Sequence, residues 1–151
     1  MSTPNPVSPV NPALLLDKQL CFALYSTSLA MTKLYKPLLE ALGLTYPQYL
    51  VMLVLWEQDD VSVSALGERL FLDSGTLTPL LKRLEAADLL VRNRSKQDER
   101  RVQISLTAAG RKLKARAASV PACMVSATHC PASELMALTE KVQALRRQLA
   151  V

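Results

Sequence analysis

Cys21 is the strongest candidate in this sequence for a reactive side chain, because two tyrosines stand at helical spacing from it. Tyr25 follows it by four residues and Tyr35 by fourteen, so all three side chains point to the same side if the segment is one α-helix. A thiolate is the nucleophilic form of cysteine, and hydroxyl groups that donate to it stabilise it. The spacing therefore favours a reactive thiol, against the alternative of a small apolar side chain buried in a core.

The length of that helix excludes a thiol site built from Cys21 and Tyr35 of one chain. Fourteen residues of α-helix span about 21 Å, so the two side chains cannot touch. A second copy whose helix runs antiparallel alongside would bring its Tyr35 to this Cys21, and the symmetry would create two identical sites. The spacing thus allows a thiol site shared between two subunits.

The basic residues gather in one short segment. The chain has 18 basic and 13 acidic residues, a net charge of +5, and residues 92–101 hold five of the basic and two of the acidic ones, or +3. A segment of this charge is suited to lie across the phosphates of a nucleic acid, and the alternative is a solvated hairpin with scattered charge. The basic side chains are Arg92, Arg94, Lys96, Arg100 and Arg101.

Small polar residues stand at the start of the helix predicted before this segment. Ser74, Thr76 and Thr78 are short enough to approach base edges, and the free amides of a helix N-terminus suit a phosphate. Lys82 lies further along, where it can contact the DNA backbone. Asp73 precedes the helix and is expected to cap it, with contact to a base as an additional role.

The composition excludes several other classes of protein. A chain of 151 residues that is 50% apolar forms one compact domain. Its longest apolar run, Tyr49–Trp56, has eight residues against the roughly 20 that span a bilayer, and no secretory pattern is visible. Three cysteines and the single His129 fit neither a disulfide framework nor a zinc site. We therefore expect a cytoplasmic protein with reduced thiols, no metal, no cofactor and no membrane partner.

The elements that must position these residues are mostly helices. Four prolines within residues 1–12 predict an extended arm, and helical spacing from Ala13 to Glu40 predicts one long helix with a kink site at Pro37, ended by Gly43. Capping residues or prolines mark the starts of the other helices: Pro47, Ser62 or Ser64, Asp73, Thr107 and Ser133. The helix from Pro47 is expected to end at Glu57, the one from Ser62 or Ser64 at Leu70, and the one after Asp73 at about Asp88. The helix after Thr107 is expected to end at Pro121 or a little beyond, and the one after Ser133 near Ala150. The expected strands are 89–94 and 101–106.

A helix–turn–helix followed by a basic hairpin forms a winged helix–turn–helix. The expected fold class is therefore mainly α with a small β-hairpin wing, an α+β arrangement. In this fold the second helix of the motif enters the major groove. Double-stranded DNA is thus the expected partner.

Four motifs together resemble the MarR family of transcriptional repressors, in particular its branch that senses organic hydroperoxides (OhrR). Leu72–Glu85 resembles the recognition helix, Asp98–Arg101 the wing signature, Leu106–Gly110 the exit from the wing, and Leu44–Tyr49 that branch. The resemblance covers residues 13–150. It implies a homodimeric repressor that binds palindromic operators and is not an enzyme. A thiol peroxidase is the alternative from the enzyme class. The resemblance also implies dimerisation helices in 13–45 and 108–150 around a DNA-binding lobe in 46–107.

The same resemblance implies which residues read DNA. Asp73, Ser74 and Thr76 would face the major groove. Arg92 would contact phosphate, and Arg100, steadied by Asp98, would enter the minor groove. The whole set expected to contact or frame DNA is Asp73, Ser74, Thr76, Thr78, Lys82, Arg92, Arg94, Asp98 and Arg100.

The resemblance further implies a redox switch. In that branch an organic hydroperoxide oxidises a cysteine near the start of the first helix to a sulfenic acid, and two tyrosine hydroxyls of the other subunit hold the sulfur. Cys21, Tyr35 and Tyr46 match those positions, with Tyr25 as a further pocket residue. The reduced protein would bind DNA and the oxidised protein would release it. An alternative is a repressor that binds a phenolic ligand between the tyrosines.

A second cysteine resolves the sulfenic acid into a disulfide between subunits in some members of the branch. Ser126 stands where that cysteine is expected, and Cys123 and Cys130 flank it. Either cysteine is a candidate resolving residue. The alternative for both is an exposed or structural thiol.

Overall fold

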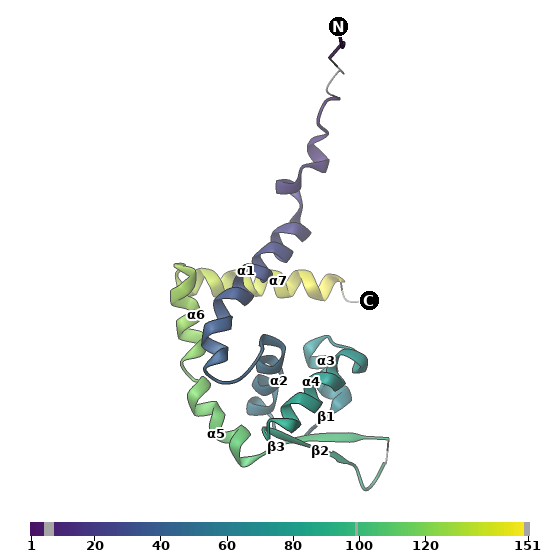
Figure 1. The fold of residues 1–151 in the computed structure, drawn as a ribbon, viewed down its shortest axis with the longest axis vertical. Coiled ribbons are helices and arrows are strands. Elements are labelled where there is room, and N and C mark those ends of the chain that lie inside the picture. Colours follow the sequence, from purple (N-terminus) through teal and green to yellow (C-terminus); the bar gives the residue numbers. More distant parts are fainter. Residues whose placement is uncertain (5–7, 99, 150–151) are drawn as a thin grey trace.

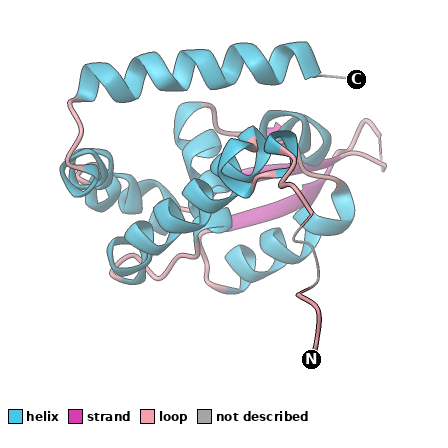
Figure 2. Cartoon of the chain, turned by 90° about the horizontal axis from the view of Figure 1, so that it is seen from above, coloured by secondary structure: helices cyan, strands magenta, loops and turns pink. Residues whose placement is uncertain are grey.

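The computed structural model describes residues 1–4, 8–98 and 100–149. Seven α-helices, two short 3-10 turns and three strands follow one another along these residues (Figures 1 and 2). Pro6 of the predicted arm, Glu99 of the predicted wing motif and Ala150 at the predicted end of the last helix lie outside the described residues. The elements in chain order are η1 (Pro12–Leu14), η2 (Leu16–Lys18), α1 (Leu20–Glu40), α2 (Tyr46–Glu57), β1 (Val61–Ser62), α3 (Val63–Leu70), α4 (Ser74–Ala86), β2 (Leu90–Arg94), β3 (Val102–Leu106), α5 (Ala108–Ala117), α6 (Val120–Thr128) and α7 (Ala132–Leu149).

A winged helix–turn–helix occupies the middle of the chain, as predicted. Helices α3 and α4 follow each other after a short turn, and the antiparallel strands β2 and β3, with the turn between them, form the wing. The register pairs Leu90 with Leu106 at the root of the wing. A third strand, β1, adds to the prediction: Val61 pairs with Ile104, which gives the strand order β1-β3-β2. The predicted fold class is therefore confirmed.

Side-chain caps fix where four helices begin. The Thr45 hydroxyl accepts from an amide in the first turn of α2, and the side chain of Gln48 accepts in return from the Thr45 amide. Ser62, Asp73 and Thr107 each accept from the amide three residues ahead, at the starts of α3, α4 and α5. These contacts satisfy amides that have no partner within the helix. They confirm the caps predicted at Asp73 and Thr107 and select Ser62 over its alternative.

The first helix begins later than predicted, at Leu20 rather than Ala13. The residues before it form two 3-10 turns, and both Leu15 and Gln19 have extended backbones. The side-chain amide of Gln19 donates to the carbonyls of Ala13 and Leu15, so a side chain satisfies groups that an α-helix would pair with backbone amides. Once begun, α1 continues through Pro37.

The C-terminal helices also depart from the prediction. The single helix expected from residue 108 is two helices, α5 and α6. Pro121 lies in the first turn of α6, where its missing amide leaves no bond unmade, instead of ending a helix. Helix α7 begins one residue before Ser133, the expected cap, and the Pro131 carbonyl accepts its first helical bonds.

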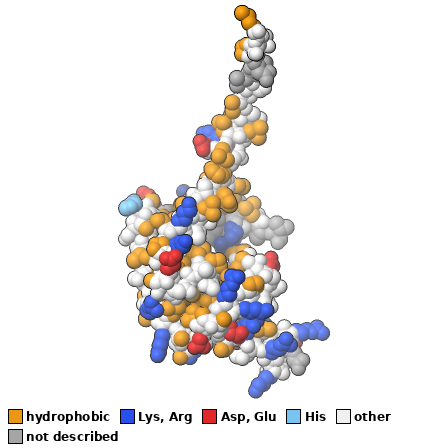
Figure 3. All heavy atoms as spheres, in the orientation of Figure 1, with side chains coloured by type: hydrophobic (Ala, Val, Ile, Leu, Met, Phe, Trp, Pro, Cys, Tyr) orange, Lys and Arg blue, Asp and Glu red, His pale blue; other side chains and the backbone are white. Residues whose placement is uncertain are grey.

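The buried core joins the winged lobe to the C-terminal end of α1. Its members run from Leu39 to Met124 along the chain. The N-terminal half of α1 and the described length of α7 contribute no residue to it. Both helices expose apolar side chains instead, and Figure 3 shows such side chains along the N-terminal stem. They are Leu20, Phe22, Leu24, Tyr25 and Leu29 of α1, and Met136, Leu138, Val142 and Leu149 of α7.

Candidate functional site

Four aromatic side chains form a cluster between α1 and α2. The ring centres of Tyr35 and Tyr46 lie 4.8 Å apart, and the Tyr49 ring lies 5.7 Å from Tyr35 and 6.4 Å from Tyr46. Trp56 extends the cluster along α2, edge-on to Tyr49 at 6.5 Å. The structure therefore brings together Tyr35 and Tyr46, two of the tyrosines predicted for the thiol pocket.

Burial changes the acid–base behaviour of these tyrosines. Loss of water around Tyr35, followed by the charges of Tyr46 and Tyr49, raises the pKa of Tyr35 to about 12. Burial also raises the pKa of Tyr46 and that of Tyr49. All three hydroxyls stay protonated near neutral pH and can donate hydrogen bonds, which is what a neighbouring thiolate requires.

Because the pKa of Tyr35 is raised, the free energy of unfolding is expected to fall as the pH rises from 10.0 to about 12. A tyrosine with a pKa of 10.0 when unfolded and about 12 when folded stabilises the fold fully below pH 10.0, and this contribution is lost as the pH rises toward 12. Tyr35→Phe should therefore flatten the fall of the unfolding free energy over that range, measured by urea denaturation. Tyr25→Phe is the matched control, because Tyr25 is 64% exposed. An equal change in both variants would contradict the assignment.

Cys21 and Tyr25 lie outside the aromatic cluster. Both are exposed on the N-terminal half of α1. The fourteen residues from Cys21 to Tyr35 form one continuous stretch of α1 and span about 21 Å. The structure therefore separates Cys21 from Tyr35 and Tyr46 of its own chain.

Two further thiols lie around α6. Cys123 on that helix and Cys130 just after it are exposed, and Ser126 lies between them in the sequence. The Cys130 thiol lies 3.4 Å from the Thr128 carbonyl, to which it donates. His129 ends the helix with a left-handed φ of 55°. All three cysteines of a single chain are therefore open to reagents.

Arg92 ties the wing to helix α4. Its guanidinium donates to one Glu85 carboxylate oxygen from Nε and Nη2, at 3.3 and 3.2 Å, and its amide donates to the other oxygen at 3.0 Å. The side-chain bond, followed by the bond from the amide, lowers the pKa of Glu85. The structure thus shows that Arg92 links α4 to β2.

Basic side chains gather at the far end of the wing. Figure 3 shows them around the hairpin turn, where Arg94 and Arg100 are exposed. The Asp98 carboxylate accepts from the Arg100 amide at 3.0 Å, and the Ser95 amide donates to the Arg101 carbonyl at 2.7 Å. Asp98 therefore steadies the backbone at Arg100 while the Arg100 side chain faces solvent.

Helix α4 turns a polar side away from the core. Ser74, Thr76 and Lys82 are exposed on it, and Thr78 is half-buried. Asp73 serves the cap, because its Oδ1 accepts from the Thr76 amide at 2.7 Å. The predicted DNA-reading residues of this helix thus share the exposed side of one element.

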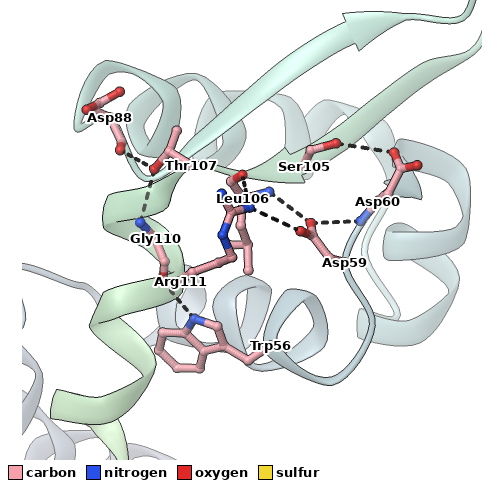
Figure 4. Close-up of polar contacts among 9 residues, drawn as sticks. All are labelled: Trp56, Asp59, Asp60, Asp88, Ser105, Leu106, Thr107, Gly110 and Arg111. Carbon is pink, nitrogen blue, oxygen red and sulfur yellow. Dashed lines mark hydrogen bonds and ion pairs between the residues drawn. The ribbon is translucent and has the colours of Figure 1, made fainter.

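A group of hydrogen bonds joins α2, α5 and the root of the wing (Figure 4). The Asp59 carboxylate accepts from the Leu106 amide at 2.9 Å. It also lies 3.7 Å from the Arg111 guanidinium, which donates to the Leu106 carbonyl at 3.0 Å. The Trp56 indole donates to the Gly110 carbonyl at 2.9 Å. We call these five residues the junction.

Two more cations of α5 hold the ends of other helices. Lys114 donates to the Trp56 carbonyl at 3.3 Å near the end of α2, and Arg116 donates to the Ala41 carbonyl at 2.6 Å at the end of α1. Cations suit these positions, because the last carbonyls of a helix lack partners and carry partial negative charge. Helix α5 is therefore bonded to α1, to α2 and to the wing.

Known proteins similar to this chain are transcriptional regulators. The sequence profile of the family described as transcriptional regulator SarA/Rot matches residues 33–117. The organic hydroperoxide resistance transcriptional regulator of Bacillus subtilis is 48% identical over 134 residues, which is 89% of this chain and 91% of that protein. The chain belongs to the MarR/SarA family, in the branch of the organic hydroperoxide resistance regulators.

Solved structures of AbfR from Staphylococcus epidermidis share the fold of this MarR/SarA regulator. Reduced AbfR bound to DNA matches with a TM-score of 0.74 at 35% identity, over 89% of this chain and 94% of that one. Disulfide-formed AbfR matches with a TM-score of 0.61 at 34% identity, over 89% of each chain. The winged fold therefore recurs in a protein solved in two thiol states.

Membership of this family confirms two predictions made from the sequence. This MarR/SarA chain is a DNA-binding transcriptional regulator and not an enzyme, as expected. No helix in the described ranges is long and apolar enough to cross a membrane. At this site, sequence reasoning missed the junction and the place of Tyr49 in the aromatic cluster. Tyr49 follows Tyr46 by three residues, a spacing that puts both on one helix face and could have revealed it.

Proposed function

We propose that this MarR/SarA regulator is a redox-sensing repressor. As a homodimer it binds palindromic operator DNA when reduced, and it releases the DNA when an organic hydroperoxide oxidises Cys21. The observation that carries the proposal is that Tyr35 packs against Tyr46 while Cys21 lies about 21 Å away on the same helix, so a second subunit is needed to join them. The name of the Bacillus subtilis relative and the reduced, DNA-bound AbfR support it.

The thiol chemistry needs one nucleophile and two hydrogen-bond donors. The Cys21 thiolate attacks the terminal oxygen of the hydroperoxide. A sulfur–oxygen bond forms, the oxygen–oxygen bond breaks, and the leaving alkoxide takes a proton to become an alcohol. The hydroxyls of Tyr35 and Tyr46 from the partner subunit hold the thiolate beforehand, and Tyr25 lines the pocket. Phe22 on the same helix supplies apolar contact suited to an organic peroxide.

The bonds of α5 offer a route from the thiol site to the wing. Helix α1 carries Cys21, and Arg116 bonds its C-terminal end to α5. Arg111 then bonds α5 to Leu106 at the root of the wing. A shift of α1 against its partner thus moves α5 and the wing together. Half-sites on a palindrome lie about 34–36 Å apart, so a small rotation of each lobe is enough to lose the match.

Reading of the operator falls to α4 and the wing. Helix α4 enters the major groove with its exposed side. The wing reaches the minor groove with Arg100, and Arg92 orients the wing through Glu85. The residues assigned to the DNA interface are those predicted from the sequence: Asp73, Ser74, Thr76, Thr78, Lys82, Arg92, Arg94, Asp98 and Arg100.

Wild-type protein tests the proposal directly. In a gel shift on a palindromic AT-rich duplex, the reduced protein should bind and should lose affinity after treatment with cumene hydroperoxide. In the same sample the mass of the Cys21 peptide should rise by one oxygen, or the peptide should become disulfide-linked. Salicylate, a phenolic compound, is the competing effector. Release by salicylate, with no response to the peroxide, would refute the redox mechanism.

Replacing the wing arginine should weaken DNA binding in a salt-dependent way. Arg100→Ala is expected to lower the slope of log affinity against log salt by about one for each phosphate that the protein no longer neutralises, hence by about two in a dimer. The measurement is a titration of one duplex at several salt concentrations. Lys141→Ala, which removes a basic side chain exposed on α7, is the matched control. An unchanged slope together with an unchanged affinity for Arg100→Ala would remove the wing from the mechanism.

A further inference from the structure

The turn between α3 and α4 contains an aromatic residue in a rare backbone conformation. Phe71 ends α3 with a φ of 56°, which lies in the left-handed region. In the described ranges, the other non-glycine residues with a left-handed φ are two aspartates and a histidine, which adopt it more readily than a bulky residue does. Phe71 is also 66% exposed, although its side chain is large and apolar. Surrounding contacts must therefore hold this residue in place.

An arginine of α7 covers the Phe71 ring. The guanidinium carbon of Arg146 lies 4.4 Å from the centre of that ring. The face of an aromatic ring is electron-rich and attracts a guanidinium that lies over it. Glu68 of α3 lines the same groove as Phe71, but within the described ranges no ion pair joins it to Arg146. The ring is therefore the partner that orients the Arg146 side chain.

The contact between Arg146 and Phe71 joins α7 to the winged lobe. The described length of α7 contributes no residue to the buried core. The C-terminal end of this helix nevertheless lies near α3, where Arg146 reaches the turn (Figure 1). Helix α7 thus meets the helix–turn–helix through the guanidinium of Arg146 and not through buried apolar side chains.

The turn that contains Phe71 packs directly on α3. The Leu72 amide donates to the Gly67 carbonyl of that helix at 3.0 Å. A methyl group on Gly67 would lie 2.8 Å from the Leu72 carbonyl oxygen, so the two segments leave no space between them. The next residue, Asp73, caps α4. A change in the backbone of Phe71 must therefore move the start of α4, where the predicted DNA-reading residues begin.

We propose that Arg146 is a positioning residue for the reading of DNA. By covering the Phe71 ring, it holds the turn in the conformation that aims α4 at the major groove. This inference rests on the proposed function, which assigns α4 to the operator. Arg146 acts through the ring and contacts no phosphate. The contact also connects α7 to α4 by a route that does not pass through α5.

A double-mutant cycle on DNA affinity tests the contact. Arg146→Gln removes the cation, and Phe71→Leu removes the ring but keeps a large apolar side chain. Each change is expected to raise the dissociation constant of the reduced protein for a palindromic AT-rich duplex about fivefold, measured by fluorescence anisotropy. The double variant should bind as well as either single variant, because each change alone already breaks the contact. Losses that multiply to about 25-fold would overturn the proposal.

Phe71→Tyr keeps an aromatic face in the turn and shows whether the ring is needed. In this background Arg146→Gln should still lower the affinity about fivefold, whereas in the Phe71→Leu background it should lower it less than about twofold. An equal effect of Arg146→Gln in both backgrounds would exclude the ring as the group through which the arginine acts.

Arg147→Gln is the matched control for charge. It removes the same charge from the next residue of α7, which is also exposed, and should change the affinity less than about twofold. Equal losses in Arg146→Gln and Arg147→Gln would assign the effect to general attraction of DNA and overturn the proposal. The slope of log affinity against log salt should stay the same in Arg146→Gln. A lower slope would place Arg146 on a phosphate and contradict its positioning role.

A measurement without DNA separates this contact from the proposed function. Amide hydrogen exchange in peptides that cover residues 67–77 should be several-fold faster in Arg146→Gln than in Arg147→Gln, because the turn opens more often. Equal exchange in the two variants would overturn the inference, even if wild-type protein still releases DNA when Cys21 is oxidised. Faster exchange together with coupled losses of affinity would support it, even if Cys21 proves not to be the sensor.

Discussion

DNA bound to a Cys21→Ser variant should stay bound when organic hydroperoxide is added. Serine differs from cysteine by one atom, so the reduced fold and its affinity for the operator should be kept. Its hydroxyl is a poor nucleophile at neutral pH and does not open the oxygen–oxygen bond. Coupling between two sites in proteins changes affinity by about 5- to 150-fold. We expect a loss in that range for oxidised wild type and less than a twofold change for the variant.

The measurement is fluorescence anisotropy of a labelled duplex before and after a stoichiometric pulse of cumene hydroperoxide. Cys123→Ser and Cys130→Ser are the matched controls, because both thiols are also exposed. If release needs only the first oxidation of Cys21, both controls should respond like the wild type. A control that loses the response would identify its cysteine as the resolving residue. Normal release from Cys21→Ser would refute the assignment of the sensor.

Replacing Gly110 by alanine should destabilise the fold by about 3 kcal/mol or more. A methyl group at this position would collide with the Leu89 carbonyl oxygen and lie 3.1 Å from a methyl group of Leu106. The Leu89 carbonyl cannot simply move aside, because it accepts from the Thr107 amide at 3.1 Å. The chain must therefore open where α5 meets the wing. Urea denaturation at a fixed protein concentration measures the loss.

Gly75→Ala is the matched control for that experiment. Gly75 also lies in the first turns of a helix, and a methyl group there would meet only the Asp73 side chain, at 3.3 Å. Alanine favours a helix over glycine by roughly 0.5–1 kcal/mol, so this variant should be unchanged or slightly more stable. Similar losses in both variants would show that the close approach of Gly110 to Leu89 is not the cause.

Local chemistry explains why much of the fold could be predicted. Asp73 and Thr107 each bond to an amide three residues away, and such caps are readable from a few letters. Gly43 has a φ of 70°, as expected of the glycine that ends a helix region. Strand β1 was missed because its two residues are strand-like only through pairing with Ile104, more than forty positions later. The late start of α1 depends on the Gln19 side chain, which propensity does not predict.

The sequence also predicted only part of the candidate site. From the spacing of Cys21 and Tyr35 it predicts that the two residues of one chain cannot touch, and the continuous helix α1 keeps them apart. The residues predicted a turn between α1 and α2 at Gly43 and Pro47, but the contact of Tyr35 with Tyr46 across that turn was implied by the resemblance alone. The junction could not be predicted, because the hydrogen bond from Trp56 to Gly110 joins residues 54 positions apart and no sequence pattern indicates it.

The bond from Trp56 to Gly110 gives the molecule a built-in optical probe. The chain has one tryptophan, half-buried at the point where α2 meets α5, and its indole proton is held by a carbonyl of that helix. If water replaced the Gly110 carbonyl as the partner of the indole, the Trp56 emission would shift to longer wavelength. The nearby Tyr49 ring would transfer excitation energy to the same indole. Unlabelled protein can therefore report, in real time, whether the two helices separate when the thiol is oxidised.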